Sequence, residues 1–206
     1  MFYILRSLSL NKHCYAWDNL SFIDWKRVIC EKCGRTVSTA QMDEGCLKLE
    51  LDGGSAYPDL LQFTGAGPRL FLLSGRALDA FTENGITGIA KAEQVSLSWI
   101  STKAKRAVSS PIPTYYSIDI DGRIDYCFKA MFLKKKNLCD RCGQFDWNRE
   151  RQPAITLDES TWTGNDLCRI SSAPGFEICT QKFVDVVKSY KLTGFECTPV
   201  DTFPPD

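Results

Sequence analysis

Two copies of a Cys-x-x-Cys-Gly motif constrain the fold of this chain more than any other feature of its sequence. The first copy spans residues 30–34 (Cys-Glu-Lys-Cys-Gly) and the second spans residues 139–143 (Cys-Asp-Arg-Cys-Gly). In a tight turn with this spacing, both thiolates face the same point, and the final glycine provides the positive φ with which such a turn ends. Each copy, called a knuckle from here on, therefore predicts a turn that offers two sulfur ligands to one metal ion.

Four thiolates from two knuckles make up the tetrahedral shell that Zn²⁺ prefers in structural sites. Neither knuckle completes the shell alone, so we expect one zinc ion shared between them. Such an ion joins distant parts of the chain, because the second knuckle follows the first by 109 residues, and links across long loops stabilise most. The predicted ligands of this single structural zinc are Cys30, Cys33, Cys139 and Cys142.

Three other interpretations of the knuckles are weaker. A thioredoxin-like redox pair occurs once, at the start of a helix, whereas this motif occurs twice and its glycine disfavours a following helix. A catalytic zinc keeps an open position and uses histidine or carboxylate ligands. The chain has one histidine, His13, and no His-Glu-x-x-His motif. Two disulfides would require an oxidising compartment.

The N-terminal segment bears on the compartment. Arg6 interrupts its apolar stretch, and the segment lacks the long apolar region and small-residue cleavage site of a signal peptide. The chain has no apolar run of about 20 residues, the length that a membrane span needs. We therefore expect a soluble cytoplasmic protein, in which thiols stay reduced. The cysteines outside the knuckles are then expected to be small buried hydrophobes: Cys14, Cys46, Cys127, Cys168, Cys179 and Cys197.

Composition and charge narrow the functional classes. The 206 residues include 25 basic and 25 acidic residues, whereas proteins that bind nucleic-acid backbones usually carry an excess of Lys and Arg. A basic cluster at Lys134–Lys136 leaves a zinc-ribbon nucleic-acid-binding protein as the alternative function. The sequence contains no Gly-rich phosphate loop and no Gly-x-Ser-x-Gly motif, and its one histidine suggests no catalytic triad. We therefore expect no enzymatic activity and assign no catalytic residue.

The sequence after each knuckle shows a second kind of repetition. Asp166 follows Asp59 by 107 residues, and Thr193 follows Thr87 by 106, close to the offset between the knuckles. Each half is therefore predicted to contain a knuckle, a short strand, an amphipathic helix and, after a Thr-Gly turn, another strand.

This repetition predicts an α+β fold with a single domain, residues 1–206. Its two halves are about residues 1–97 and 115–206, with 98–114 as the connecting segment. We expect the duplicated halves to surround a mixed β-sheet and to be clipped together by one zinc-ribbon-like site of four cysteines.

Local signals place the main elements. Ser74 and Thr180 precede apolar residues at helical spacing, so each is predicted to cap the N-terminus of a helix. The segment from Phe2 to Leu10 is typical of a first strand. Alternating apolar residues on either side of Asp121-Gly122 predict a hairpin whose turn lies at these two residues.

The order of these features resembles that of the double-CXXCG motif proteins, a bacterial family first noted as paralogues in myxobacteria and linked to immunity against contact-delivered toxins. The matching features are the two knuckles, the Gly85-Ile86-Thr87-Gly88 turn, and the C-terminal run from Asp166-Leu167 through Phe183 to residues 192–195 (Leu-Thr-Gly-Phe). Together they span nearly the whole chain.

The resemblance implies a protein that binds a cognate toxin domain in the cytoplasm of the producing cell and neutralises it. Inhibition would come from occlusion, with affinity supplied by a few buried aromatic or arginine anchors inside a polar rim and by complementary charge. A toxin protein is therefore the expected partner, with no membrane partner and no nucleic acid. The motifs assign no residue to the toxin-contacting surface.

Overall fold

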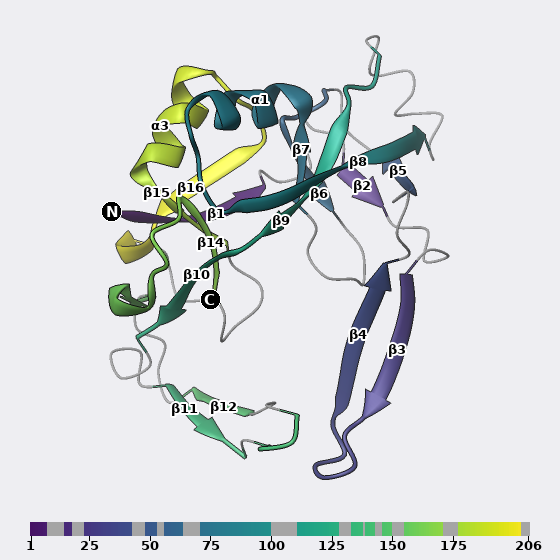
Figure 1. Cartoon of the computed structure of the whole chain (residues 1–206), viewed down its shortest axis with the longest axis vertical. Coiled ribbons are helices and arrows are strands. Elements are labelled where there is room, and N and C mark those ends of the chain that lie inside the picture. The colour runs from purple at the N-terminus through teal and green to yellow at the C-terminus, as the bar shows by residue number, and fades with distance from the viewer. Residues whose placement is uncertain are drawn as a thin grey trace.

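The computed structural model describes residues 1–7, 15–17, 23–42, 48–52, 56–63, 71–99, 111–127, 133–137, 139–142, 146–149, 155–170 and 177–202. Strands predominate in a mixed α+β fold, and two α-helices occur in these ranges (Figure 1). His13, Cys14 and Cys46 lie outside the described residues. Neither described helix combines the length and the apolar character that a membrane crossing requires.

Six strands form a closed barrel in the order β2-β5-β8-β9-β7-β6. Buried apolar side chains from these strands cluster together, among them Leu51, Leu72 and Tyr115. Because successive residues of a strand point to opposite faces, the cluster fixes one face of β5, β6, β7, β8 and β9 toward the barrel interior. The strands are β2 (Tyr15–Trp17), β5 (Lys48–Asp52), β6 (Leu60–Phe63), β7 (Phe71–Ser74), β8 (Ile89–Trp99) and β9 (Tyr115–Ile120).

A second sheet of six strands has the order β13-β10-β14-β15-β1-β16. The predicted first strand is confirmed as β1, and it lies between β15 and β16, antiparallel to both. Two 3-10 helices, η1 (Glu159–Thr161) and η2 (Val200–Thr202), follow β13 and β16. The strands are β1 (Phe2–Ser7), β10 (Gly122–Tyr126), β13 (Leu157–Asp158), β14 (Leu167–Ile170), β15 (Glu177–Thr180) and β16 (Phe195–Pro199).

The helices α1 (Gly75–Glu83) and α3 (Gln181–Ser189) begin at the predicted caps. The side chains of Ser74 and Thr180 accept hydrogen bonds from backbone N–H groups of the first turn, which confirms both predictions. The two helices meet through Phe81 and Phe183, whose ring centroids are 4.6 Å apart. These rings belong to the main core, which buries side chains from both helices and both sheets.

Two hairpins extend from this body and meet at their tips (Figure 1). The first consists of β3 (Ile23–Ile29) and β4 (Thr36–Met42), which pair antiparallel along their whole length. The second consists of β11 (Leu133–Lys136) and β12 (Asp146–Arg149), also antiparallel. Each hairpin carries one knuckle between its strands, so the knuckles lie far from the main core.

The predicted hairpin at Asp121-Gly122 is wrong. The two flanking strands form as expected, but β9 pairs with β7 and β8, whereas β10 pairs with β13 and β14. The chain therefore passes from one sheet to the other at these residues. Gly122 is required there for a different reason from a hairpin turn, because a Cβ at this position would lie 2.1 Å from the Leu167 carbonyl oxygen.

Gly88 and Gly194 occupy matched positions beside the strands that follow the two helices. Both have a positive φ, +98° and +86°. A Cβ on Gly88 would lie 2.0 Å from the Leu167 carbonyl oxygen, and one on Gly194 would lie 2.5 Å from the Leu60 carbonyl oxygen. Gly88 therefore allows the Thr-Gly turn after α1 to approach β14 closely, and Gly194 allows the Thr-Gly turn after α3 to approach β6 closely.

Replacement of Gly88 by alanine is expected to destabilise the protein strongly. The left-handed backbone costs about 1–2 kcal/mol and the clash with Leu167 adds about 1–3 kcal/mol. Gly164→Ala is the matched control, because Gly164 has a φ of +86° and no atom within 4 Å of the added Cβ. Thermal unfolding followed by circular dichroism should show the larger decrease in Tm for Gly88→Ala. Equal decreases would contradict the close approach.

Candidate metal centre

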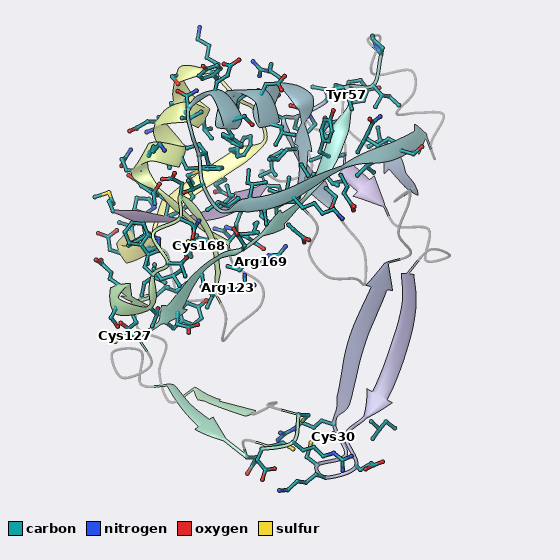
Figure 2. All side chains as sticks on the ribbon, in the orientation of Figure 1. Cys30, Tyr57, Arg123, Cys127, Cys168 and Arg169 are labelled. Carbon is teal, nitrogen blue, oxygen red and sulfur yellow. The ribbon has the colours of Figure 1, made fainter. Side chains whose placement is uncertain are left out.

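The first knuckle is shaped by backbone hydrogen bonds that close the turn between β3 and β4. The Gly34 N–H donates to the Cys30 carbonyl oxygen at 2.8 Å, and the Cys30 N–H donates to the Arg35 carbonyl oxygen at 2.9 Å. Gly34 has a φ of +70°, as its place in the motif predicts. This turn brings the sulfurs of Cys30 and Cys33 close to those of the other knuckle. Figure 2 shows Cys30 at the tip where the two hairpins meet.

The four predicted ligands converge on one point. One sulfur from each of Cys30, Cys33, Cys139 and Cys142 forms a group whose atoms all lie within 4.8 Å of one another. The Sγ atoms of Cys30 and Cys139 are 3.7 Å apart, and those of Cys33 and Cys142 are 3.6 Å apart. A tetrahedral site with Zn–S bonds of about 2.3 Å requires S–S separations of about 3.8 Å. The geometry is thus compatible with one zinc ion, and the separations exceed the S–S bond of a disulfide.

Backbone amides favour the thiolate form that a metal needs. Hydrogen bonds from the backbone of Cys33 and Lys32 lower the pKa of Cys30 to about 6. In the second knuckle, the backbone of Cys142 has the largest effect and lowers the pKa of Cys139 below its ordinary value. Both knuckles therefore favour the deprotonated form of one sulfur, which is the form that binds a metal.

Ion pairs link the two knuckles reciprocally. Lys32 of the first knuckle pairs with Asp140 of the second at 2.6 Å, and Arg141 of the second pairs with Glu31 of the first at 2.6 Å. All four side chains are more than half exposed, so each pair contributes little stability. Arg35 also donates to the Asn137 carbonyl oxygen at 2.9 Å. These contacts favour one relative orientation of the knuckles.

The other described cysteines stand apart from this group. Burial raises the pKa of Cys168 to about 11 and raises that of Cys179 well above its ordinary value, which fits the expected role of inert buried thiols. Cys127 and Cys197 are half-buried. None of these four belongs to the metal-ligating group found among the described residues.

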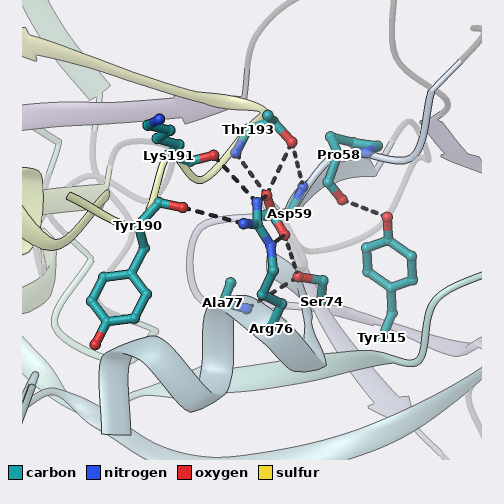
Figure 3. Close-up of polar contacts among 9 residues, drawn as sticks. All are labelled: Pro58, Asp59, Ser74, Arg76, Ala77, Tyr115, Tyr190, Lys191 and Thr193. Carbon is teal, nitrogen blue, oxygen red and sulfur yellow. Dashed lines mark hydrogen bonds and ion pairs between the residues drawn. The ribbon is translucent and has the colours of Figure 1, made fainter. Parts of the chain in front are cut away.

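A second organised group, which the motifs did not assign, surrounds the carboxylate of Asp59 (Figure 3). Arg76 donates two hydrogen bonds to this carboxylate, at 2.6 and 3.1 Å. Ser74 donates at 2.7 Å, and Thr193 donates through its backbone N–H and its hydroxyl at 2.8 and 3.0 Å. Arg76 also donates to backbone carbonyls at the end of α3, those of Tyr190 and Lys191.

Asp166 has corresponding hydrogen-bond partners, with the roles of α1 and α3 exchanged. Its carboxylate accepts from Thr180 at 2.8 Å and from Lys182 at 3.2 Å, both at the start of α3. It also accepts from the backbone N–H and the hydroxyl of Thr87, at 3.1 and 3.2 Å. Lys182 further donates to the Gly85 carbonyl oxygen after α1. We refer to these two groups as the Asp59 and Asp166 clamps.

The two clamps hold ionised carboxylates. Burial raises the pKa of each aspartate, but the hydrogen bonds outweigh it, so both pKa values lie below the ordinary value. For Asp59 the donors are Arg76, Thr193 and Ser74. The Asp59 clamp therefore ties the N-terminus of α1 to the Thr-Gly turn after α3, and the Asp166 clamp ties the N-terminus of α3 to the Thr-Gly turn after α1. The sequence offered one signal, since both aspartates and both threonines recur at nearly constant offsets.

Comparison with known proteins gives no match to a protein-family model and no similar sequence among curated proteins. The chemistry of the site therefore rests on its own geometry. The group holds four sulfurs, the number that a tetrahedral site needs, and no histidine or carboxylate of the described part of the chain belongs to it. Such a set is typical of a structural metal rather than of a catalytic metal with an open position.

Substitution of one metal ligand is expected to destabilise the whole protein. Cys33→Ser removes one of four sulfurs that join hairpins distant in sequence, and loss of a structural metal removes stability that its binding supplies. We expect loss of bound zinc, measured by atomic absorption, and a Tm lower by at least about 10 °C. Cys127→Ser is the control, because this half-buried cysteine lies outside the group. A Cys33→Ser/Cys139→Ser protein with no metal and a native Tm would contradict a structural zinc.

The Asp59 clamp predicts a specific pH dependence of stability. Because the pKa of Asp59 is lower in the folded state, its contribution is present above the unfolded pKa of about 3.9 and is lost as pH falls through the folded pKa. Asp59→Asn should destabilise the protein at pH 7 by about 2–4 kcal/mol and weaken the decrease in stability below about pH 4. Urea unfolding at several pH values measures both effects. The exposed Asp121→Asn control should change neither; equal profiles for all three proteins would contradict the clamp.

Proposed function

We propose that this protein is an immunity protein of the double-CXXCG motif family, which binds and neutralises a cognate bacterial toxin in the cytoplasm. The observation that carries the proposal is the sulfur-only group formed by the two knuckles. A closed four-sulfur set supports a structural role for the metal, and it leaves the surface of the protein available for binding. Such an inhibitor needs no catalytic residue, because occlusion of the toxin suffices.

Zinc is the metal we propose for this site, with one ion per chain. The four-thiolate donor set, the S–S separations and the lowered pKa of Cys30 all support it. The matched Asp59 and Asp166 clamps support the further proposal that the chain contains two duplicated halves, with the zinc-ribbon-like site as the second connection between them.

The alternative, a zinc-ribbon protein that binds nucleic acid, receives less support from the charges at the metal centre. Lys32 and Arg141 are each paired with a carboxylate across the knuckles. A zinc ion with four thiolates adds a net charge of about −2. The Lys134–Lys136 cluster lies on β11 of the second hairpin. Phosphate binding is favoured by unpaired cations, and the paired knuckles do not supply them.

Co-purification tests the proposed function. The tagged chain is co-expressed with the protein encoded by the adjacent gene, and both stoichiometry and zinc content are measured on the same sample. We expect a 1:1 complex with one zinc per chain, together with restored growth of cells that express the neighbouring protein. Cys33→Ser should lose the complex through unfolding, whereas the Cys127→Ser control should keep it.

A folded, zinc-containing chain that neither binds nor neutralises the neighbouring protein would contradict the immunity role. Nucleic-acid binding is measured in parallel at low and moderate salt. Binding that weakens steeply with salt would favour the alternative function, because counterion release produces that dependence. The absence of any such binding removes the alternative.

A further inference from the structure

The two six-stranded sheets have the same order of strands when β1–β8 are matched in turn with β9–β16, so that β1 corresponds to β9 and β8 corresponds to β16. In the barrel, the order can be traced as β5-β2-β6-β7-β9-β8, and in the second sheet it is β13-β10-β14-β15-β1-β16. Each strand of one sheet has its counterpart eight strands later in the other, with one exception. The exception is the first strand of each series, because β9 lies in the sheet of the first series and β1 lies in that of the second.

The directions of pairing agree as well. β2 and β6 are parallel, and so are their counterparts β10 and β14. The other pairs that both sheets share are antiparallel, including β2 with β5 and β10 with β13. The barrel has one further parallel pair, β5 with β8, which has no counterpart in the second sheet. A parallel pair at the same place in two otherwise antiparallel arrangements is a specific topology, since sheets of one direction are over-represented.

The registers of β1 and β9 are equivalent along β15 and β7 and at the start of β16 and β8. A β-bulge between Ile89 and Lys91 shifts the rest of the pairing of β9 with β8 by one residue. Phe2 pairs with Thr180, the cap of α3, and Tyr115 pairs with Ser74, the cap of α1. At the other end, Ser7 pairs with the residue after Gly194, and Ile120 pairs with the residue after Gly88. β1 and β9 therefore occupy the same slot, between the strand before a helix and the strand after it.

We infer that the chain consists of two copies of one eight-stranded unit that exchange their first strands, so that the surface between the units is a homodimer interface carried within one chain. The partner that this surface fits is a second copy of the unit. The inference builds on the duplication proposed above and is independent of toxin binding. The boundary between the units lies between the end of β8 at Trp99 and the start of β9 at Tyr115.

The exchange relates three kinds of connection between the units, because in each kind the two units make the same contribution to one another. Each unit donates its first strand to the other sheet, each Thr-Gly turn donates to the aspartate of the other unit, and each knuckle supplies half of the sulfur group. The copies differ in closure. The pairing of β5 with β8 closes the barrel of the first unit, whereas β13 and β16 are opposite edges of the second sheet.

A circular permutant tests this inference on the complete set of residues. The new chain begins with an initiator methionine at Pro111, continues to Asp206, and is joined by a seven-residue Gly/Ser linker to residues 1–110. The join is short because Pro199 of β16 pairs directly with Tyr3 of β1. In this permutant β16 and β1 become a hairpin, as β8 and β9 are in the native chain. The control has the same linker but is opened between Gly53 and Gly54, inside the first unit.

The permutant that begins at Pro111 should bind one zinc per chain and unfold with a Tm within about 5 °C of the native protein. The control should be less stable, because its ends separate strands of one unit. A control as stable as that permutant, or more stable, would overturn the inference. The zinc content and Tm report on the fold alone, so they distinguish this result from a failure to bind a toxin.

Matched substitutions in the native chain provide the second measurement, which decides the matter if neither permutant folds. Leu5 of β1 and Ile118 of β9 are equivalent, since they pair with Glu177 and Phe71 at the same register, and both are buried in the main core. Leu5→Ala and Ile118→Ala should lower the Tm by amounts that agree within about 3 °C. A native Tm for Leu5→Ala, with a lowered Tm for Ile118→Ala, would show β1 to be an appended strand and overturn the inference.

Discussion

The rest of the structure depends on the hydrogen bonds of two buried carboxylates, those of Asp59 and Asp166. Each accepts hydrogen bonds from the start of one helix and from the Thr-Gly turn beyond the other helix. An ionised carboxylate that is removed from water must be fully hydrogen-bonded to be tolerated, so these donors are fixed in place. The helices, their caps and the close approach at Gly88 and Gly194 are arranged around that requirement.

The metal centre acts at the opposite end of the molecule by a different principle. A metal bound there would join two hairpins whose cysteines are 109 residues apart in the sequence, and so would close a long loop. Closure of that loop restricts the unfolded chain, whereas the clamps and the main core stabilise the folded one. The hairpin tips are therefore joined at the sulfur group rather than through the main core.

Local sequence signals predicted the features that depend on neighbouring residues. Cysteine spacing predicted the four cysteines whose sulfurs lie together, and the helix caps followed from Ser74 and Thr180. The prediction of a hairpin at Asp121-Gly122 was wrong, because a turn signal predicts that the chain turns between two strands but does not indicate which sheet each strand joins. The role of Asp59 was missed for a related reason: Thr193, its partner, lies 134 residues away. The fold-level pairing of β1 with β15 and β16 likewise has no local signature.

The position of β1 has a consequence for biosynthesis. A ribosome produces this strand long before β15 and β16, between which it must insert. Nascent domains usually acquire structure from the N-terminus onward, yet here the second sheet stays incomplete until translation has passed β16. During that interval β1 exposes unpaired backbone groups, which are a template for association with other chains. β1 therefore gains its two neighbouring strands only after β16 has been synthesised, so the order of synthesis and the order of pairing differ for this strand.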